Sequence, residues 1–174
     1  MSLKKYLPLL IIAPLAILID QLAKVWIINN VMLGQTIPIL EGLQPYLQIT
    51  RTTNTGFAFG LASDGNMIIL ILAVIITIAL LWMYDSSKPT EGLQRIAFAL
   101  VIGGAIGNII DRIRLDHVVD FVHVTIPGLI SNVSNFADHF VVIGVIVLFI
   151  DSFLNEAVEE SDTPSPQELD ESVA

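Results

Sequence analysis

Four long apolar runs, separated by polar segments, restrict the fold of this 174-residue chain more than any other feature of its sequence. A helix needs about 20 mostly apolar residues to cross the hydrocarbon core of a bilayer. Residues 6–28, 66–84, 96–113 and 137–154 meet that requirement, and the second run holds no charged residue at all. The sequence therefore predicts an all-α membrane protein with four transmembrane helices.

Composition supports the same class. Hydrophobic residues make up 54% of the chain and charged residues 14%, against about a quarter charged in a typical soluble domain. The chain has no cysteine, which excludes disulfides and a cysteine nucleophile. The net charge of −9 comes largely from residues 155–174, which hold seven acidic residues and no basic one. The eight Lys and Arg residues are scattered, so no nucleic-acid partner is expected.

The segments outside the apolar runs predict the remaining organisation. Residues 29–65 contain Gly, Pro and an alternating stretch at 46–51, which favours a small β-rich cap. Residues 85–95 form a short polar loop, and 114–136 form a second connection broken by Pro127 and Gly128. Residues 1–154 are thus expected to form one membrane domain, followed by a disordered acidic tail over 155–174.

The unusual polar residues are predicted to gather at one membrane face. In an alternating four-span chain, the ends of spans one and three lie on the same side as the starts of spans two and four. The polar residues of those regions are Asp20, Gln21, Lys24, Thr53, Asn54, Gly56, Asn108, Asp111, Arg112, Asp120, Asn135 and Asp138. Ionisable groups near the membrane interior are costly and usually mark function.

Local spacing adds detail to this set. Asp20 and Lys24 are four residues apart, so they can pair across one helical turn. Gly103 and Gly107 form a GxxxG step that lets another helix approach closely. Asp138 lies in the first turn of the fourth span, where the helix dipole favours an anion.

The chemistry best suited to this set is that of paired carboxylates. The chain lacks an HExxH motif and a glycine-rich phosphate loop, and no Ser-His-Asp arrangement is evident. Four carboxylates remain near one face, those of Asp20, Asp111, Asp120 and Asp138. Two neighbouring carboxylates share one proton, so that one can activate water while the other polarises a carbonyl. Spacing alone does not select the pair. No metal or cofactor is expected, and His117, His123 and His139 are interpreted as interfacial polar residues.

Five ordered motifs resemble those of the bacterial lipoprotein signal peptidases, also called signal peptidase II. They are Asp20-Gln21-x-x-Lys24, residues 53–60 (TNTGFAFG), residues 103–112 (GGAIGNIIDR), residues 118–121 (VVDF) and residues 135–138 (NFAD). The resemblance extends from Asp20 to about Asp151. Any one of these motifs would be weak evidence, but their order and spacing together are specific.

The resemblance implies an aspartic endopeptidase whose dyad is Asp120 and Asp138. Its substrates would be lipid-modified prolipoproteins, cut just before the diacylglyceryl-cysteine. It implies a multi-pass protein of the bacterial cytoplasmic membrane, with both termini cytoplasmic, the cap extracytoplasmic and the active site near the outer face. Membrane lipids are expected contacts, and a monomer is expected. The residues matching the family's other recurring polar positions, expected to bind substrate or support the site, are Asp20, Lys24, Asn54, Asn108, Asp111, Arg112 and Asn135.

Two positions depart from the family pattern. Ser134 stands where a Phe is expected, and His139 directly follows the dyad residue Asp138. Both departures bear on local packing and on the pH profile of the site. The acidic tail lies outside the pattern.

Two other functions fit parts of the sequence. A proton-coupled transporter would use the aspartates and Lys24 as a relay, although the polar residues lie at one face instead of along a path across the bilayer. An assembly partner would use the GxxxG step to recruit other membrane proteins, which leaves the four carboxylates without a purpose.

Overall fold

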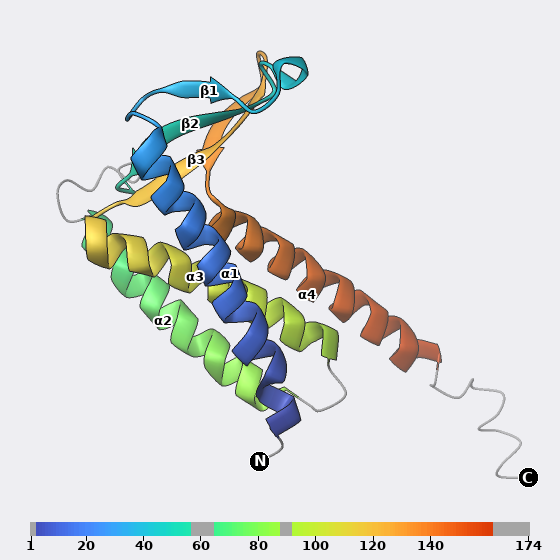
Figure 1. Cartoon of the computed structure of the whole chain (residues 1–174). Coiled ribbons are helices and arrows are strands. Elements are labelled where there is room, and N and C mark those ends of the chain that lie inside the picture. Colours follow the sequence, from blue (N-terminus) through green and yellow to red (C-terminus); the bar gives the residue numbers. More distant parts are fainter. Residues whose placement is uncertain (1–2, 57–64, 88–91, 162–174) are drawn as a thin grey trace, which may run out of the picture.

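Four long helices form the body of the protein in the computed structural model, which describes residues 3–56, 65–87 and 92–161 (Figure 1). They are α1 (Leu3–Asn30), α2 (Gly65–Ser86), α3 (Gly92–Leu115) and α4 (Phe136–Ser161). Each contains a stretch long and apolar enough to cross a membrane. The prediction of a four-span membrane protein is confirmed. α4 continues to Ser161, past the predicted end of the fourth span, and the rest of the predicted tail lies outside the described residues.

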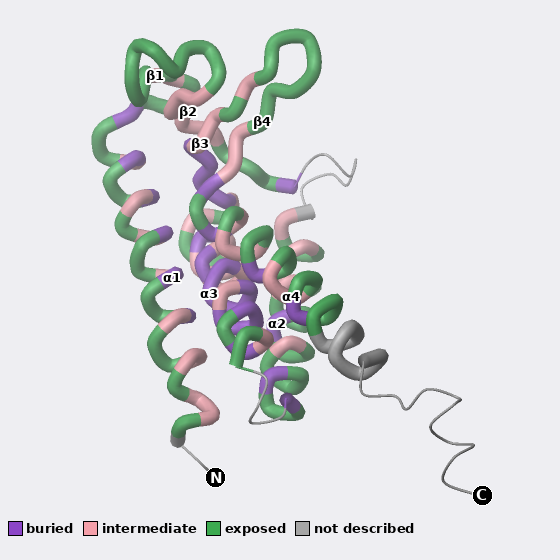
Figure 2. The backbone as a smooth tube through the Cα atoms, turned by 90° about the vertical axis from the view of Figure 1, so that its right-hand side faces the viewer, coloured by how far each residue is buried: buried purple, intermediate pink, exposed green. Residues whose placement is uncertain are grey.

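Helix α3 is the centre of the bundle. In its most apolar stretch 56% of the residues are buried, against 17%, 11% and 17% in the corresponding stretches of α1, α2 and α4. α3 packs against each of the other three helices, and the buried residues of the body follow it (Figure 2). Polar residues carried by α3 therefore lie inside protein, whereas the outward faces of the other helices are apolar and suited to lipid.

Small residues on α3 let its neighbours approach closely. A Cβ added at Gly107 would lie 2.8 Å from Oδ2 of Asp20 on α1 and 3.2 Å from Cβ of Ala137 on α4. A Cβ at Gly103 would lie 2.9 Å from the Ala13 carbonyl oxygen of α1. The expected role of the GxxxG step is confirmed, and Gly107 is the point where three helices meet at the polar set.

A four-stranded antiparallel sheet caps one end of the bundle (Figure 1). Its strands are β1 (Thr36–Pro38), β2 (Leu47–Asn54), β3 (Val118–Ile126) and β4 (Ile130–Ser134), in that spatial order, and a 3-10 turn, η1 (Glu41–Leu43), lies between β1 and β2. The expected β-rich cap is present, but half of its strands come from the connection between α3 and α4, which the sequence did not assign to the cap. Residues Val118–Phe121 are all buried, so β3 begins without the polar–apolar alternation that marks a strand.

The sheet is seated on the end of α1. Ile27 of α1 and Val31, which directly follows that helix, form a small apolar core with Val119 and Phe121 of β3. Arg51 of β2 donates from Nη1 to the carbonyl oxygens of Ile28 (3.0 Å) and Val31 (2.9 Å). Ile28 belongs to the last turn of α1, whose carbonyls lack partners within the helix, and Val31 directly follows the helix. A cation at this end of a helix is favourable. The cap is thus fixed to the helix that carries Asp20 and Lys24.

The close approach at Gly107 predicts a large effect of a single methyl group. Gly107→Ala is expected to destabilise the folded protein by about 1–3 kcal/mol, because the new methyl would collide with a buried, fully engaged carboxylate. The measurement is thermal unfolding of the purified protein in detergent. Gly42→Ala is the matched control, since a Cβ there meets nothing within 4 Å. Equal melting temperatures for the two variants would contradict the packing.

Candidate active site

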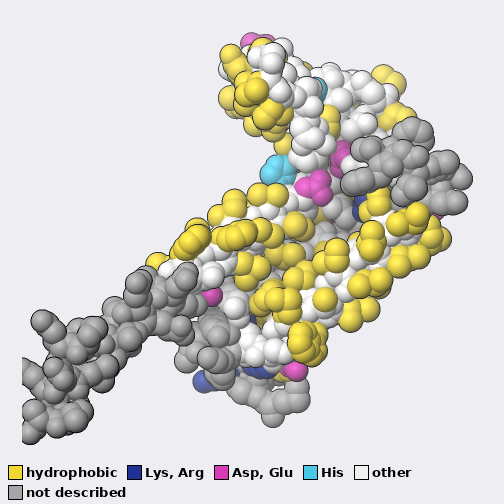
Figure 3. Space-filling model, turned by 180° about the vertical axis from the view of Figure 1, so that it is seen from behind, with side chains coloured by type: hydrophobic (Ala, Val, Ile, Leu, Met, Phe, Trp, Pro, Cys, Tyr) yellow, Lys and Arg dark blue, Asp and Glu magenta, His cyan; other side chains and the backbone are white. Residues whose placement is uncertain are grey.

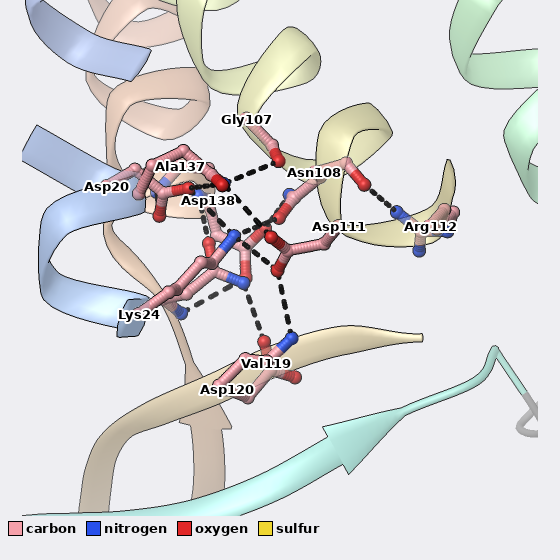
Figure 4. Close-up of polar contacts among 12 residues, drawn as sticks. Asp20, Lys24, Gly107, Asn108, Asp111, Arg112, Val119, Asp120, Ala137 and Asp138 are labelled. Carbon is pink, nitrogen blue, oxygen red and sulfur yellow. Dashed lines mark hydrogen bonds and ion pairs between the residues drawn. The ribbon is translucent and has the colours of Figure 1, made fainter. Parts of the chain in front are cut away.

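A buried lysine lies at the centre of the polar set (Figure 4). Nζ of Lys24 is 2.8 Å from Oδ2 of Asp20 and 2.9 Å from Oδ2 of Asp111, and it donates to Oδ1 of Asn108 at 3.1 Å. Lys24, Asp20 and Asp111 are each at most 1% exposed. The predicted i,i+4 pair of Asp20 and Lys24 is present, and the structure adds Asp111 and Asn108 from α3. All three donor hydrogens of the ammonium are used.

Gln21 belongs to this network, although sequence reasoning did not count it among the site residues. Its Nε2 donates to Gly107 O (3.1 Å) and to Oδ1 of Asp111 (3.0 Å), and lies 3.2 Å from Oδ2 of Asp20. Its Oε1 accepts from Nη1 of Arg114 at 3.2 Å. Sequence patterns place Gln21 with Asp20 and Lys24 in the polar set and in the first motif, but not among the residues expected to bind substrate or support the site.

The two acids paired with Lys24 also hold backbone next to the predicted dyad. Oδ2 of Asp111 accepts from the amide of Val119 at 3.0 Å, and Oδ1 of Asp20 accepts from the amide of Ala137 at 2.9 Å. Val119 immediately precedes Asp120, and Ala137 immediately precedes Asp138. A carboxylate on the amide of Ala137 also satisfies an orphan donor in the first turn of α4. The Lys24 network therefore sets the position of both chain segments that carry the dyad.

Asn135 joins the two predicted catalytic aspartates. Its Nδ2 donates to Oδ1 of Asp120 at 2.6 Å, and its Oδ1 accepts from the amide of Asp138 at 3.0 Å. Its own amide donates to Oδ2 of Asp138 at 3.3 Å, and Asn108 donates from Nδ2 to Oδ1 of Asp138 at 2.7 Å. Through its bond to the amide of Asp138, Asn135 acts as the N-cap of α4. The structure thus brings Asp120 and Asp138 to the two sides of one buried side chain.

The Asp120 carboxyl lies in β3 and is 2% exposed. Burial raises the pKa of Asp120 to about 6, and the negative charge of Asp138 adds to this effect, whereas hydrogen bonds from Asn135 and Asn54 and the charge of Lys24 act in the opposite direction. Asn54 thereby reaches the site from β2 and also closes a turn by accepting the amide of Gly56 at 3.0 Å. The rest of its sequence motif, including Phe57 and Phe59, lies outside the described residues.

Arg112 approaches the same aspartates from the end of α3. Its Nη1 lies 3.4 Å from the carbonyl oxygen of Asn108, while its buried Nε has no hydrogen-bond partner within the described residues. It interacts electrostatically with Asp138, Asp120 and Asp111. Within the described residues Arg112 forms no ion pair with the neighbouring Asp111 at salt-bridge distance, and Oδ2 of Asp111 pairs with Lys24 instead. Arg112 therefore has donor capacity left beside the dyad.

The site opens to the surface beneath the sheet. The space-filling view has a hollow between the cap and the helices, where acidic and histidine side chains reach the surface between largely apolar faces (Figure 3). Asp120 is buried and Asp138 is half-buried, so the pair lies at the inner limit of the accessible region. Within the described ranges, no group of three or more His, Asp or Glu is placed to hold a metal ion.

Two carboxylates joined by one amide, at the junction of a membrane helix bundle and a small sheet, define a membrane-embedded hydrolase of the aspartic type. The family model for signal peptidase (SPase) II matches residues 12–154. The chain belongs to the signal peptidase II family of aspartic peptidases, and it is a multi-pass membrane protein of bacterial type.

Individual relatives agree with that assignment. The chain is 40% identical to the lipoprotein signal peptidase of Brucella ovis over 83% of its own length and 89% of the relative. It is 37% identical to the lipoprotein signal peptidase of Bartonella tribocorum over 76% and 78% of the two chains. A bacterial membrane enzyme solved in meso at 2.3 Å superposes with a TM-score of 0.77 at 29% identity, covering 90% of this chain and 93% of that one. A second, solved at 1.9 Å, gives 0.75 at 31% identity over 82% and 90%.

The central position of Lys24 predicts that its neutralisation unfolds the site. Lys24→Met is expected to cost about 3–5 kcal/mol, because it leaves the buried carboxylates of Asp20 and Asp111 without their shared cation. The measurement is thermal unfolding in detergent together with peptidase activity, and both should fall. Lys4→Met, at an exposed position on the same helix, is the control and should match the wild type. A melting temperature for Lys24→Met equal to that of the control would contradict this role.

Proposed function

We propose that the protein removes signal peptides from lipid-modified prolipoproteins by cutting before the diacylglyceryl-cysteine, with Asp120 and Asp138 as the reactive pair. The observation that carries this proposal is the Asn135 side chain, which bonds the Asp120 carboxylate with one atom and the amide of Asp138 with the other. The names of the Brucella and Bartonella relatives supply the substrate class.

The two aspartates have different surroundings, which supports different roles. Asp120 is buried and its pKa is raised to about 6, so it is the aspartate of the pair that carries the proton. It donates a hydrogen bond to the scissile carbonyl oxygen. Both oxygens of Asp138 accept hydrogen bonds from N–H groups, an arrangement suited to an ionised carboxylate. Asp138 is therefore the base that takes a proton from water.

The reaction then follows the general aspartic-peptidase course. The water oxygen attacks the carbonyl carbon while Asp138 takes its proton, and the carbonyl oxygen takes the proton of Asp120. The resulting tetrahedral diol collapses as the amide nitrogen takes the proton held by Asp138 and the C–N bond breaks. One hydroxyl of the diol returns its proton to Asp120. Arg112 and Asn54 lie close enough to Asp120 to bind substrate backbone beside the pair.

An apolar substrate in the bilayer can reach this site from the side. The outward faces of α1, α2 and α4 are apolar, and the hollow beneath the sheet lies at the ends of these helices. A signal peptide would stay in the lipid while its cleavage region enters the hollow. The remaining outward faces of the helices then contact membrane lipids. Both aspartates of the proposed pair come from one chain, so a monomer is sufficient for activity.

The proposed orientation places both termini in the cytoplasm and the sheet on the outer face of the bacterial cytoplasmic membrane. The positive-inside rule counts basic residues in short loops near the spans. The sequence has four basic residues toward each end of the spans, but Lys24 is engaged inside the bundle. Arg95 at the other end is also buried. Leaving out Lys24 and Arg95 gives three basic residues at each end, so charge alone does not choose an orientation and family membership supports it.

A proton relay across the membrane is not favoured by the buried polar groups. Between the two ends of the bundle, Thr77 is the buried polar residue of the described spans, and its hydroxyl donates to the carbonyl of Ala73 in its own helix. The four carboxylates of the site, those of Asp20, Asp111, Asp120 and Asp138, lie at the capped end, whereas Asp85 and Asp151 lie toward the other end. A hydrolytic function uses that arrangement, whereas transport would need polar groups along the path.

Replacing either member of the pair by its amide tests the assignment. Asp120→Asn and Asp138→Asn are each expected to lower cleavage of a lipid-modified prolipoprotein by at least a thousandfold while the protein remains folded, because neither proton transfer survives. Asp116→Asn is the control: it makes the same change at an exposed residue near Asp120, in a left-handed conformation (φ 60°) that Asn also adopts. Wild-type activity in either dyad variant would exclude the proposed pair.

The raised pKa of Asp120 predicts the pH dependence. The reactive form needs the proton on Asp120, so it is populated below pH 6 and is lost as pH rises through about 6. The value of kcat/KM should therefore fall about tenfold per pH unit above that point. The measurement is cleavage of a synthetic substrate from pH 5 to pH 8.5 in one detergent. A rate that stays constant over this range would refute the proposed role of Asp120.

A further inference from the structure

His139 occupies the first turn of α4, directly after Asp138, and among the residues that the structure describes its ring makes one hydrogen bond. Its Nδ1 lies 2.6 Å from the carbonyl oxygen of Asn135. A carbonyl oxygen only accepts hydrogen bonds, so Nδ1 carries the hydrogen. The backbone amide of His139 donates to the same oxygen at 3.3 Å. The residue is exposed, so this ring does not serve the apolar core.

The residue that His139 holds is the one that joins the proposed pair. The Asn135 side chain bonds the carboxylate of Asp120 and the amide of Asp138, and its amide donates to the carboxylate of Asp138. Asn135 lies between the end of β4 and the start of α4, so its backbone is not fixed by a strand ladder. A second donor on its carbonyl restricts the rotation of that peptide and so the direction of the side chain.

We infer that His139 is a positioning residue for peptide cleavage, which holds the Asn135 amide in place between the two aspartates by donating from Nδ1 to the Asn135 carbonyl. This inference rests on the proposed function of the pair. His139 itself touches neither the Asp120 nor the Asp138 carboxyl through any described hydrogen bond. Its effect therefore passes through Asn135 and should change the rate of the chemical step more than the binding of substrate.

The same geometry predicts a shift in the pH profile. The charged groups that act on Asp120 are Asp138 from α4, Lys24 from α1 and Arg112 from α3. The hydrogen bond from Asn135 opposes the effect of burial and lowers the pKa of Asp120. If Asn135 is held less firmly, that bond weakens and the pKa of Asp120 rises further. The alkaline limb of kcat/KM then moves to higher pH.

Two substitutions separate the hydrogen bond from the imidazole. His139→Leu removes the donor, whereas His139→Asn places an amide N–H near the position of Nδ1 and cannot ionise. His139→Leu is expected to lower kcat about three- to tenfold, the equivalent of one hydrogen bond, with KM unchanged and the alkaline limb moved up by a few tenths of a pH unit. His139→Asn should restore both kcat and the position of the limb.

The outcomes that overturn the inference are distinct from those that overturn the proposed pair. Wild-type kcat and pH profile in His139→Leu would exclude a positioning role, and so would an Asn variant that behaves like the Leu variant. Asp120→Asn and Asp138→Asn are measured with the same substrate. If either of these remains active, the proposed pair itself fails, whatever the result at His139.

Discussion

The arrangement of the site depends on one buried cation. The ammonium of Lys24 lies within 3 Å of the carboxylates of Asp20 and Asp111, where water does not screen the interaction. Each carboxylate also accepts a hydrogen bond from a backbone amide, Asp20 from that of Ala137 and Asp111 from that of Val119. A single charge thereby ties α1 to α3 and, through both acids, to the strand and the helix that carry Asp120 and Asp138.

Close packing makes this network possible. Charged groups near a bilayer are tolerated only where protein surrounds them, and α3 supplies that surrounding as the most buried helix of the bundle. Gly107 has no side chain, and a larger residue at this position would collide with the carboxylate of Asp20. The cap closes the network from outside, held to α1 by apolar contacts and by Arg51.

Much of this could be predicted. The four spans, the grouping of acids at one end and the pairing of Asp20 with Lys24 all follow from patterns within a few residues or from simple alternation across the membrane. The motifs pointed to Asp120 and Asp138 by resemblance. Gln21 was not counted as a site residue and β3 was not recognised as a cap strand, because a lone glutamine and a fully buried strand start have no distinctive local pattern.

The sequence alone determined that the chain crosses a membrane four times. A helix needs a minimum number of apolar residues to cross the hydrocarbon core, so the length of each apolar run is sufficient to identify a span. Only the tertiary structure decided which polar groups of the site contact one another. Asp20 meets Ala137 across 117 positions of sequence, and Lys24 meets Asn108 across 84. Contacts between residues so far apart in the sequence produce no periodic pattern, because helix packing and the few hydrogen-bond partners available in a buried site decide them. That packing places Asn135 between Asp120 and Asp138.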